Sequence, residues 1–400
     1  MNILLVIPSL ALGGAEVFVV RLANCLSKRG NNVFLLDINP DRRSPLLTAR
    51  IAPEVNLIHF DKSISFIQKL IWKIIFTISR FTNKLLFKSI QLRKRQDAKK
   101  LSRLIESLVQ QYKIQVVNSH LASADWMVTH YFATHTRNQK FIISMHGCYN
   151  QDDVYTNPGK KQLHRDMQRG LELADHIVLL TKKNALPLKG LQLRNKPVYI
   201  PLGFEAPAGW ATNTEIQAPA YSITFGLVSR AVARKGWEEA ISATQKLQKG
   251  GINCRLILVG GSEYQQKLQQ QFDHLPYIQF VGAASQVLGY VSQFDVGLFP
   301  SCIESESFPN TVIEYLACGK PVIGTDIGEV KNMISTPEGE YAGRLLDYDS
   351  AGISIKQLVN FMREYGQDKG MLSEHSRLAK IAFKKFDMIK CVEAYEAVYR

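Results

Sequence analysis

The sequence predicts an α/β protein made of two doubly wound domains that face each other across a cleft. Short runs rich in Val, Ile and Leu alternate with helix-like stretches through both halves of the 400-residue chain. These runs are continuously apolar, as parallel strands are when helices cover both faces of their sheet. Between the halves, residues 205–220 have no long apolar run and are rich in Ala, Pro, Gly and Thr, which indicates a linker.

The strand-like runs indicate where the domains begin and end. Helix-like stretches with a 3.6-residue period separate most of these runs. The first half has seven runs, at residues 2–7, 32–38, 55–60, 114–120, 140–147, 176–181 and 197–203, and the second half has six, at residues 221–229, 254–261, 278–282, 296–301, 321–326 and 343–347. We therefore predict an N-terminal domain over residues 1–204, a linker over 205–220, a C-terminal domain over 221–383 and a final helical segment over 384–400.

The composition is that of a folded globular protein. Hydrophobic residues make up 46% of the chain, which is enough for sizeable cores. The chain opens with an apolar strand that lacks the basic n-region of a signal peptide, and no window holds 18 uncharged apolar residues. The six cysteines are scattered and include no C-x-x-C pair, which argues against a disulfide framework or a zinc site. We therefore expect a cytoplasmic protein with reduced thiols.

One stretch, residues 304–326, places two acids around an expected helix start. Pro309 suits the first position of a helix, because a proline lacks the N–H group that would be unpaired there. Glu306 then precedes the helix, and Glu314 lies about 7.5 Å along its axis from Pro309. The free N–H groups and the positive dipole end between the two acids can bind a phosphate. A nucleotide-sugar, with a diphosphate between two sets of hydroxyls, fits this arrangement, although two solvated acids would give the same spacing.

Cations follow the first strand of the second half. Arg230 and Lys235 lie in the loop between the strand at 221–229 and the next helix. A bidentate guanidinium and an ammonium at this place can stabilise the negative charge that develops on a leaving diphosphate. Arg234, in the same loop, is interpreted as a solvated charge.

The first half offers a glycine pair and two strand-end histidines. Gly13 and Gly14 lie between the first strand and the first helix, where a glycine lets the backbone approach a ligand closely. They do not form G-x-G-x-x-G, so the nicotinamide-binding fingerprint is missing. His146 and His120 each end an apolar strand. We expect a functional role for His146, and for His120 we favour a structural one.

These residues together resemble the retaining nucleotide-sugar glycosyltransferases of family 4, which have the GT-B fold of two Rossmann-like domains. Glu306 and Glu314 match the E-x7-E motif of that family, and the sequence ACGKPVIGTDIG follows as it usually does. Arg230 and Lys235 match its Arg-x4-Lys-Gly motif. LVGGSE, FVGAAS and DVGLFPS match its later strand ends, and SLALGGAE matches its N-terminal Gly-rich loop. The resemblance covers nearly the whole chain, and the motifs occur in the family's order.

The resemblance also implies roles for single residues. Glu306 would bind hydroxyls of the donor sugar, Glu314 would bind the ribose hydroxyls, and Arg230 and Lys235 would bind the diphosphate. The final helix would cross back onto the first domain. Further residues would line the site: the backbone near Phe308, Asn310 and Thr311 would contact sugar or phosphate, Gly14 beside Gly13 would approach the diphosphate or the acceptor, and His146 would line the sugar site.

Two positions depart from the family pattern. The usual E-G-F-G is Glu306-Ser307-Phe308-Pro309 here, which narrows the freedom of the backbone beside the sugar. The usual I-P-N-G before the linker has Leu202 in place of the asparagine, which removes a polar side chain near the hinge. The first departure leaves the identity of the donor sugar open.

The expected activity is transfer of a sugar from a nucleotide-sugar to a hydroxyl acceptor, with retention of configuration, in the synthesis of cell-surface polysaccharide. The expected acceptor is lipid-linked or a glycan. No metal-ligand cluster is found, and Asp347-Tyr348-Asp349 is interpreted as a solvated turn, so we expect no metal. We expect no cofactor either, since the nucleotide-sugar is a substrate. Other functions remain open at this stage: a nucleotide-sugar epimerase or a sugar phosphorylase of the same fold, and a non-catalytic, membrane-associated protein that binds sugar nucleotides.

Residues 62–100 form a basic insertion in the first domain, with eleven basic residues and the single acid Asp97. If this segment is a helix with 100° per residue, five of its cations fall within a stripe about 100° wide. They are Lys69, Lys73, Arg80, Lys84 and Lys88. Trp72 lies among the apolar residues that cover the rest of the helix surface. A core helix with one wet face would show this pattern. We favour an interfacial helix that binds anionic lipids at the inner face of the cell membrane. Nucleic acid is not an expected partner, because the chain has no nucleic-acid motif.

Overall fold

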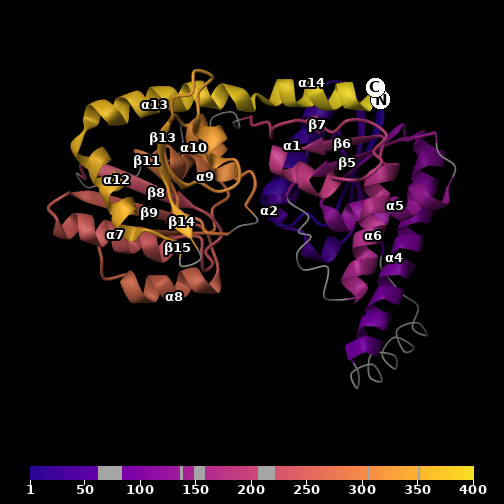
Figure 1. Ribbon diagram of the computed structural model, residues 1–400, viewed down its shortest axis with the longest axis horizontal. Coiled ribbons are helices and arrows are strands. Elements are labelled where there is room, and N and C mark those ends of the chain that lie inside the picture. The colour runs from indigo at the N-terminus through magenta and orange to yellow at the C-terminus, as the bar shows by residue number, and fades with distance from the viewer. Residues whose placement is uncertain (62–82, 136–137, 148–157, 206–220, 304–305, 350–351) are drawn as a thin grey trace. The chain divides into compact units, whose positions relative to one another are not determined.

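The computed structural model describes residues 1–61, 83–135, 138–147, 158–205, 221–303, 306–349 and 352–400. The chain divides into two compact units: unit 1 comprises Met1–Pro201 and Ile389–Arg400, and unit 2 comprises Leu202–Met388 (Figure 1). Each unit has a parallel sheet with helices on its faces. The two doubly wound α/β domains expected from the sequence are therefore confirmed. Most of the expected linker, residues 206–220, lies outside the described residues.

The sheet of unit 1 has seven parallel strands in the order β3-β2-β1-β4-β5-β6-β7. Every strand lies inside one of the apolar runs predicted above. The strands are β1 (Asn2–Ile7), β2 (Asn32–Asp37), β3 (Asn56–His59), β4 (Val116–His120), β5 (Lys140–Met145), β6 (His176–Leu179) and β7 (Val198–Tyr199). The strand order changes direction between β1 and β4. In doubly wound sheets, ligands bind beyond the carboxyl ends of the two strands at such a switch point.

Helices cover both faces of this sheet. Three long helices, α4 (Asn83–Tyr112), α5 (Ala122–Thr134) and α6 (Pro158–Leu173), pack side by side (Figure 1). Their apolar side chains share one buried core with β1, β2, β4 and β5. Helix α1 (Gly14–Lys28) follows β1, and short helical turns occur at α2 (Pro45–Thr48), Pro40–Arg42 and Lys182–Leu188.

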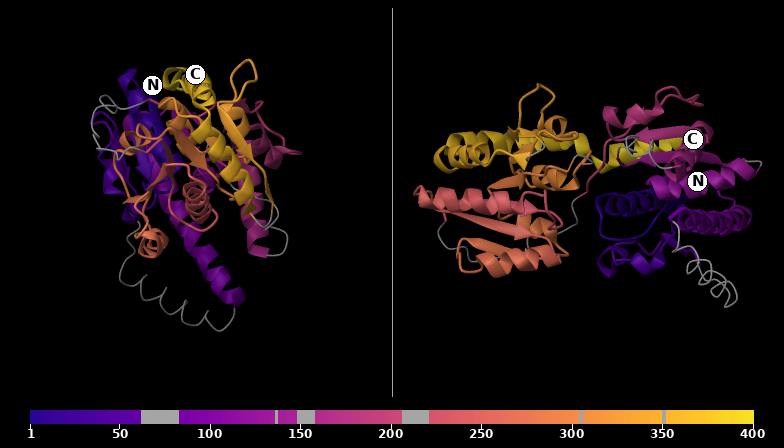
Figure 2. Two further views of the ribbon diagram at one scale, coloured as in Figure 1. Left: turned by 90° about the vertical axis from the view of Figure 1, so that its left-hand side faces the viewer. Right: turned by 60° about the horizontal axis from the view of Figure 1, so that its bottom comes forward.

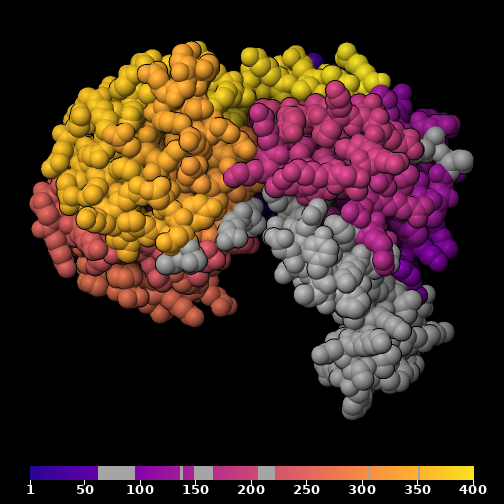
Figure 3. Space-filling model, in the orientation of Figure 1, coloured from indigo at the N-terminus to yellow at the C-terminus, as the bar shows by residue number. Residues whose placement is uncertain are grey.

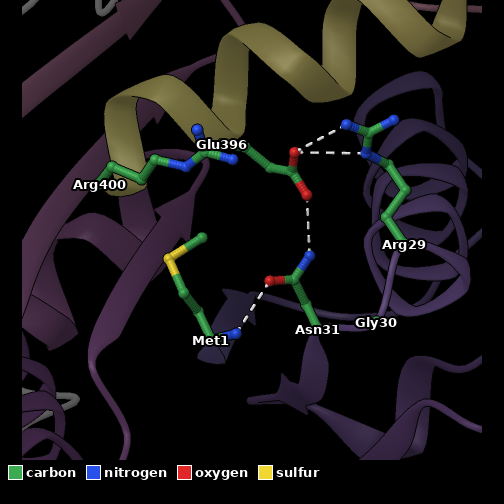
Figure 4. Close-up of a pocket in the computed structure, with 6 residues that line it drawn as sticks. All are labelled: Met1, Arg29, Gly30, Asn31, Glu396 and Arg400. Atoms are coloured by element: carbon green, nitrogen blue, oxygen red, sulfur yellow. Dashed lines mark hydrogen bonds and ion pairs between the residues drawn. The ribbon is translucent and has the colours of Figure 1, made fainter.

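The final helix, α14 (Met388–Tyr399), returns the chain to unit 1. Its buried Tyr399 hydroxyl donates to Asn118 Oδ1 of β4 at 2.7 Å. At its end, the Glu396 carboxylate accepts hydrogen bonds from Arg29 and Asn31, and Asn31 also accepts from the ammonium of Met1 (Figure 4). The two ends of the chain therefore lie next to each other on unit 1 (Figure 2).

The sheet of unit 2 has six parallel strands in the order β10-β9-β8-β11-β12-β13, and its switch point lies between β8 and β11. The strands are β8 (Ile223–Val228), β9 (Cys254–Val259), β10 (Ile278–Gly282), β11 (Val296–Phe299), β12 (Val322–Thr325) and β13 (Gly343–Leu346). All six lie inside predicted runs. A short antiparallel hairpin, β14 (Tyr348–Asp349) with β15 (Gly352–Ile353), stands where a solvated turn was expected.

The helices of unit 2 are α7 (Trp237–Lys249), α8 (Glu263–Phe272), α9 (Val287–Val291), α10 (Asn310–Ala317), α11 (Val330–Ile334), α12 (Ile355–Gln367) and α13 (Lys369–Phe383), followed by the turn Lys384–Phe386. In Figure 3, the later part of unit 2, orange to yellow, covers most of the visible face of that unit, and the earlier part, salmon, lies along its left and lower edge. Across the described residues of the whole chain, no helix combines the length and the apolar character needed to cross a bilayer.

The basic insertion is only partly described. Lys69, Trp72, Lys73 and Arg80 lie outside the described residues. Lys84 and Lys88 fall on the first turns of α4, whose backbone is helical, but their side chains belong to the part that the structure does not describe. The expected membrane contact therefore stays a prediction.

Candidate functional site

Two loops at the switch point of unit 2 are fixed to each other. One follows β8 and the other follows β11. The backbone N–H of Cys302 donates to the carbonyl of Arg234 at 2.8 Å. Gly236 has φ +80°, and a Cβ on it would lie 2.5 Å from the carbonyl oxygen of Pro300. Only a glycine combines this conformation with this close approach. Gly236 therefore allows the loop after β8 to pack directly against the loop after β11.

A third loop, after β12, supports the backbone of Glu306. Gly328 has φ +58°, and a Cβ on it would lie 2.6 Å from the carbonyl oxygen of Ser307 and closer still to that of Glu306. The N–H of the next residue, Glu329, donates to the Ser307 carbonyl at 2.9 Å. Three strand-end loops thus position Glu306.

These loops bring Lys235 and Glu306 together. The ammonium of Lys235 forms an ion pair with Glu306 Oε1, and the two side chains are only 13% and 20% exposed. Burial, and next the guanidinium of Arg230, lower the pKa of Lys235 to about 8. The carboxylate of Glu306 acts in the opposite direction and favours the charged ammonium. The sequence predicted both residues for the site but gave no sign that they pair directly.

Helix α10 starts beside this ion pair. It begins at Asn310, and Pro309 is its N-cap with φ −72° and ψ 116°, so the prediction that Pro309 is the first helical residue is wrong by one position. An extended ψ lies outside the helical range, which excludes Pro309 from the helix. Asn310 and Thr311 form the first turn, and the half-buried Glu314 lies on the second. The ring of Phe308 packs edge-on against Phe386, with centroids 5.9 Å apart.

Tyr315, which the sequence did not single out, anchors α10 to the sheet. It is fully buried, its hydroxyl accepts from the N–H of Val228 at 2.8 Å, and it donates to the carbonyl of Leu298 at 3.1 Å. Gly297 of β11 makes room for the ring, because a Cβ there would lie 2.5 Å from Tyr315 Cγ. The glycine inside a central strand was the one available signal of this contact.

The Tyr315→Phe variant should lower the free energy of unfolding by about 1–3 kcal/mol, because it leaves the buried Val228 N–H without its acceptor. Urea unfolding measures this loss. Tyr264→Phe is a control, since the Tyr264 hydroxyl bonds to Glu238 at an exposed place. Equal stability of the two variants would contradict an anchoring role for Tyr315.

In unit 1, His120 and His146 lie at the carboxyl ends of two paired strands: His120 ends β4, and His146 comes directly after β5. His120 Nδ1 and His146 Nε2 lie 2.9 Å apart and share a hydrogen bond. Burial lowers the pKa of His146 to about 4 and that of His120 well below its ordinary value. Both imidazoles are therefore neutral at pH 7. Each can orient the other, so His120 is tied to the residue that was expected to be functional.

Gly13 and Gly14 lie at the other strand of that switch point, β1. Gly13 is the N-cap of α1, and Gly14 is the first residue of the helix. The carboxylate of Glu16 lies directly over Gly13, where a Cβ would meet it. This end of α1 therefore already carries a negative group.

Comparison with known protein families gives one match for each half of the chain. A model described as Glycosyltransferase Family 4 matches residues 12–206, and a model described as Glycosyl transferases group 1 matches residues 222–360. The chain belongs to glycosyltransferase family 4. The second match contains the loops that hold Lys235 and Glu306, and the first contains the Gly13 loop and both histidines.

Individual relatives of this chain are distant in sequence. An uncharacterized glycosyltransferase of Methanocaldococcus jannaschii is 26% identical over 229 residues, which cover 54% of this chain and 56% of the relative. The GDP-mannose-dependent alpha-(1-6)-phosphatidylinositol dimannoside mannosyltransferase of Mycobacterium tuberculosis is 29% identical over 136 residues, 33% of each chain. The chain thus spans about half the length of the first relative and a third of the second.

Solved structures of low sequence identity share the fold over the full length. Anabaena HepE, solved in complex with UDP and glucose, has a TM-score of 0.71 at 15% identity, with 99% of this chain and 98% of HepE covered. At this identity the likeness establishes the fold of each unit. The expected GT-B fold is confirmed.

Proposed function

We propose that this chain is a metal-independent, retaining glycosyltransferase that moves a hexose from a nucleoside-diphosphate sugar to a hydroxyl acceptor. The observation that carries the proposal is the half-buried Lys235–Glu306 ion pair beside the start of α10. It combines, at the switch point of one sheet, a cation for phosphate, a carboxylate for hydroxyls and a helix N-terminus. HepE binds UDP and glucose and the mycobacterial relative uses GDP-mannose, which supports a donor of this class.

The residues divide the donor between them. The diphosphate would lie at the first turn of α10, against Lys235 and Arg230. Glu306 would then accept hydrogen bonds from sugar hydroxyls, and Glu314, one turn further along the helix, from the ribose. Because Lys235 and Glu306 are already paired, donor binding would exchange one half-buried ionic contact for others: the diphosphate would take the ammonium, and sugar hydroxyls would take the carboxylate.

The transfer follows from this placement. The bond between the anomeric carbon and the diphosphate oxygen breaks, and its electron pair leaves with the diphosphate. The acceptor oxygen bonds to the anomeric carbon on the same face, and its proton passes to a diphosphate oxygen. Lys235 and Arg230 stabilise the negative charge that grows on the leaving group. NMR of the product tests this chemistry: the new linkage should have the anomeric configuration of the donor, and inversion would contradict the proposal.

Chelation should leave the rate unchanged, because Lys235, Arg230 and the helix N-terminus supply the charge that a divalent ion would otherwise supply. Transfer rates with and without EDTA measure this. A loss of activity in EDTA that Mg²⁺ or Mn²⁺ restores would contradict metal independence.

The pH profile should report Lys235. Its pKa of about 8 lies below the ordinary value, so its charge is present below pH 8 and is lost as the pH rises. We therefore expect kcat/KM to fall above pH 8, since this ratio follows the free enzyme. In Lys235→Arg the fall should disappear from this range, because a guanidinium stays charged. If kcat/KM fell equally above pH 8 in the wild type and in Lys235→Arg, the titrating group would be another residue.

Unit 1 is proposed to contact the acceptor. The Glu16 carboxylate over Gly13 disfavours a diphosphate there and favours hydroxyl groups. The neutral pair of His120 and His146 can likewise donate to or accept from a hydroxyl without adding charge. We propose a glycan acceptor, lipid-linked and presented at the inner face of the cell membrane by the basic insertion 62–100. Incubation of the enzyme with donor alone tests the alternative: a new sugar epimer would indicate an epimerase.

A further inference from the structure

A charged hollow lies in unit 1, away from the strand ends. It is a cavity of about 530 Å³ between α4, α5 and α6. The three helices stand side by side in Figure 1. The residues that give the cavity its chemistry are Arg95 and Lys99 of α4, Trp126 and His130 of α5, and Asp166 and Arg169 of α6. His130 lies about 12 Å along α5 from Ala122, the first residue of that helix, so the cavity is distinct from the histidine pair.

Small residues create the hollow. The floor is formed by Ala98, which is 1% exposed, and by Thr129 and Ala133. Helices α5 and α6 come together at Gly170, where a Cβ would collide with the Thr129 hydroxyl. The small side chains leave a gap between closely packed helices, and the long cationic side chains surround its mouth.

The cavity has a surplus of positive charge. Arg95 and Lys99 are four residues apart on α4 and project from the same face of the helix, opposite Arg169. Among the described residues that line the cavity, Asp166 is the single acid, and its Oδ2 accepts from the Trp126 indole at 3.2 Å. Within the described part of the chain, none of the three cations forms an ion pair.

His130 lies within this positive field. Its pKa is lowered first by burial and next by the charges of Lys99 and Arg95. The imidazole is therefore neutral at pH 7 and offers a hydrogen bond rather than a charge. Two guanidiniums, one ammonium and one imidazole around a hollow form a set of donors suited to a phosphate group.

We propose that this cavity binds the phosphate headgroup of an anionic phospholipid. Guanidinium groups bind phosphate oxygens in pairs, and the small floor leaves room for the headgroup. The partly exposed Trp126 at the cavity suits the boundary between lipid and water. The inference rests on the proposed membrane association and extends it to a defined site on α4, α5 and α6.

The test is flotation of the full chain with phosphatidylcholine vesicles, with and without phosphatidylglycerol. The triple variant Arg95→Gln, Lys99→Gln, Arg169→Gln should bind the anionic vesicles about fivefold more weakly for each cation removed. A control triple removes the same charge from exposed sites of unit 1: Lys28→Gln, Lys182→Gln, Lys189→Gln. It should bind within about twofold of the wild type. Equal losses in both triples would overturn the proposal.

A charge-conserving variant separates a cavity from a basic surface. Ala133→Phe should fill the hollow and weaken vesicle binding, although all cations remain; circular dichroism checks that it is folded. Unchanged binding by Ala133→Phe would contradict the proposal. A second outcome would also contradict it: inorganic phosphate stabilises the wild type but not the triple variant, while all variants bind vesicles equally. The cavity would then hold a soluble anion and not a lipid headgroup. Donor binding in unit 2 should be unaffected, so a failure here leaves the proposed transferase function standing.

Discussion

Glu306→Ala should reduce sugar transfer by about 10²–10³-fold while the protein stays folded. The variant removes the carboxylate that is proposed to hold the donor sugar, and it leaves the Lys235 ammonium, 13% exposed, without its partner. Lys235→Ala should cause a loss of similar size, because the leaving diphosphate loses a cation. Release of nucleoside diphosphate from the donor measures both effects.

Matched controls separate this effect from general changes in charge. Glu263→Ala and Lys249→Ala remove the same charges from exposed positions of unit 2 and should leave the rate unchanged. Circular dichroism and thermal melts establish that all four variants are folded. Full activity in Glu306→Ala and Lys235→Ala would refute the assignment of the site.

Gly328→Ala should reduce activity by about 10²-fold through displacement of Glu306. The added Cβ would overlap the carbonyl oxygens of Glu306 and Ser307, and the φ of +58° disfavours any other residue. Backbone on both sides of the contact has to shift, so the sugar-binding carboxylate moves. We also expect a stability loss of about 1–3 kcal/mol, measured by urea unfolding.

Gly339→Ala is the control for Gly328→Ala. Gly339 has φ +90°, but a Cβ on it would meet nothing within 4 Å, so alanine adds backbone strain without a collision. It should lose stability and keep its activity. If Gly328→Ala also kept its activity, the loop after β12 would have no role in positioning Glu306.

The sheets could be predicted from the sequence because their strands are continuously apolar. Runs such as NILLVI and CRLILV are typical of strands buried on both faces, and both form interior strands of their sheets. The predicted start of α10 was wrong by one residue. Proline is compatible with both the N-cap and the first helical position, and the extended ψ of Pro309 makes it the N-cap here.

The contacts that build the site were less predictable, because they join distant segments. Lys235 and Glu306 were both candidates, but their ion pair depends on β8 and β11 being neighbours in the sheet, which spacing alone does not reveal. Gly328 and Tyr315 were missed for the same reason: each matters through a partner in another loop or strand. The structural role expected for His120 stays a prediction, and the hydrogen bond that it shares with His146 likewise joins residues of two different strand ends.

The most direct test of the central claim is a thermal-shift measurement with UDP-, GDP- and ADP-sugars on the wild type and on Lys235→Ala. If Lys235 and the start of α10 bind the donor diphosphate, at least one nucleotide-sugar raises the Tm of the wild type, and the shift is lost in Lys235→Ala but kept in Lys249→Ala. A shift of equal size in Lys235→Ala, or no shift with any nucleotide-sugar in the wild type, would contradict the account.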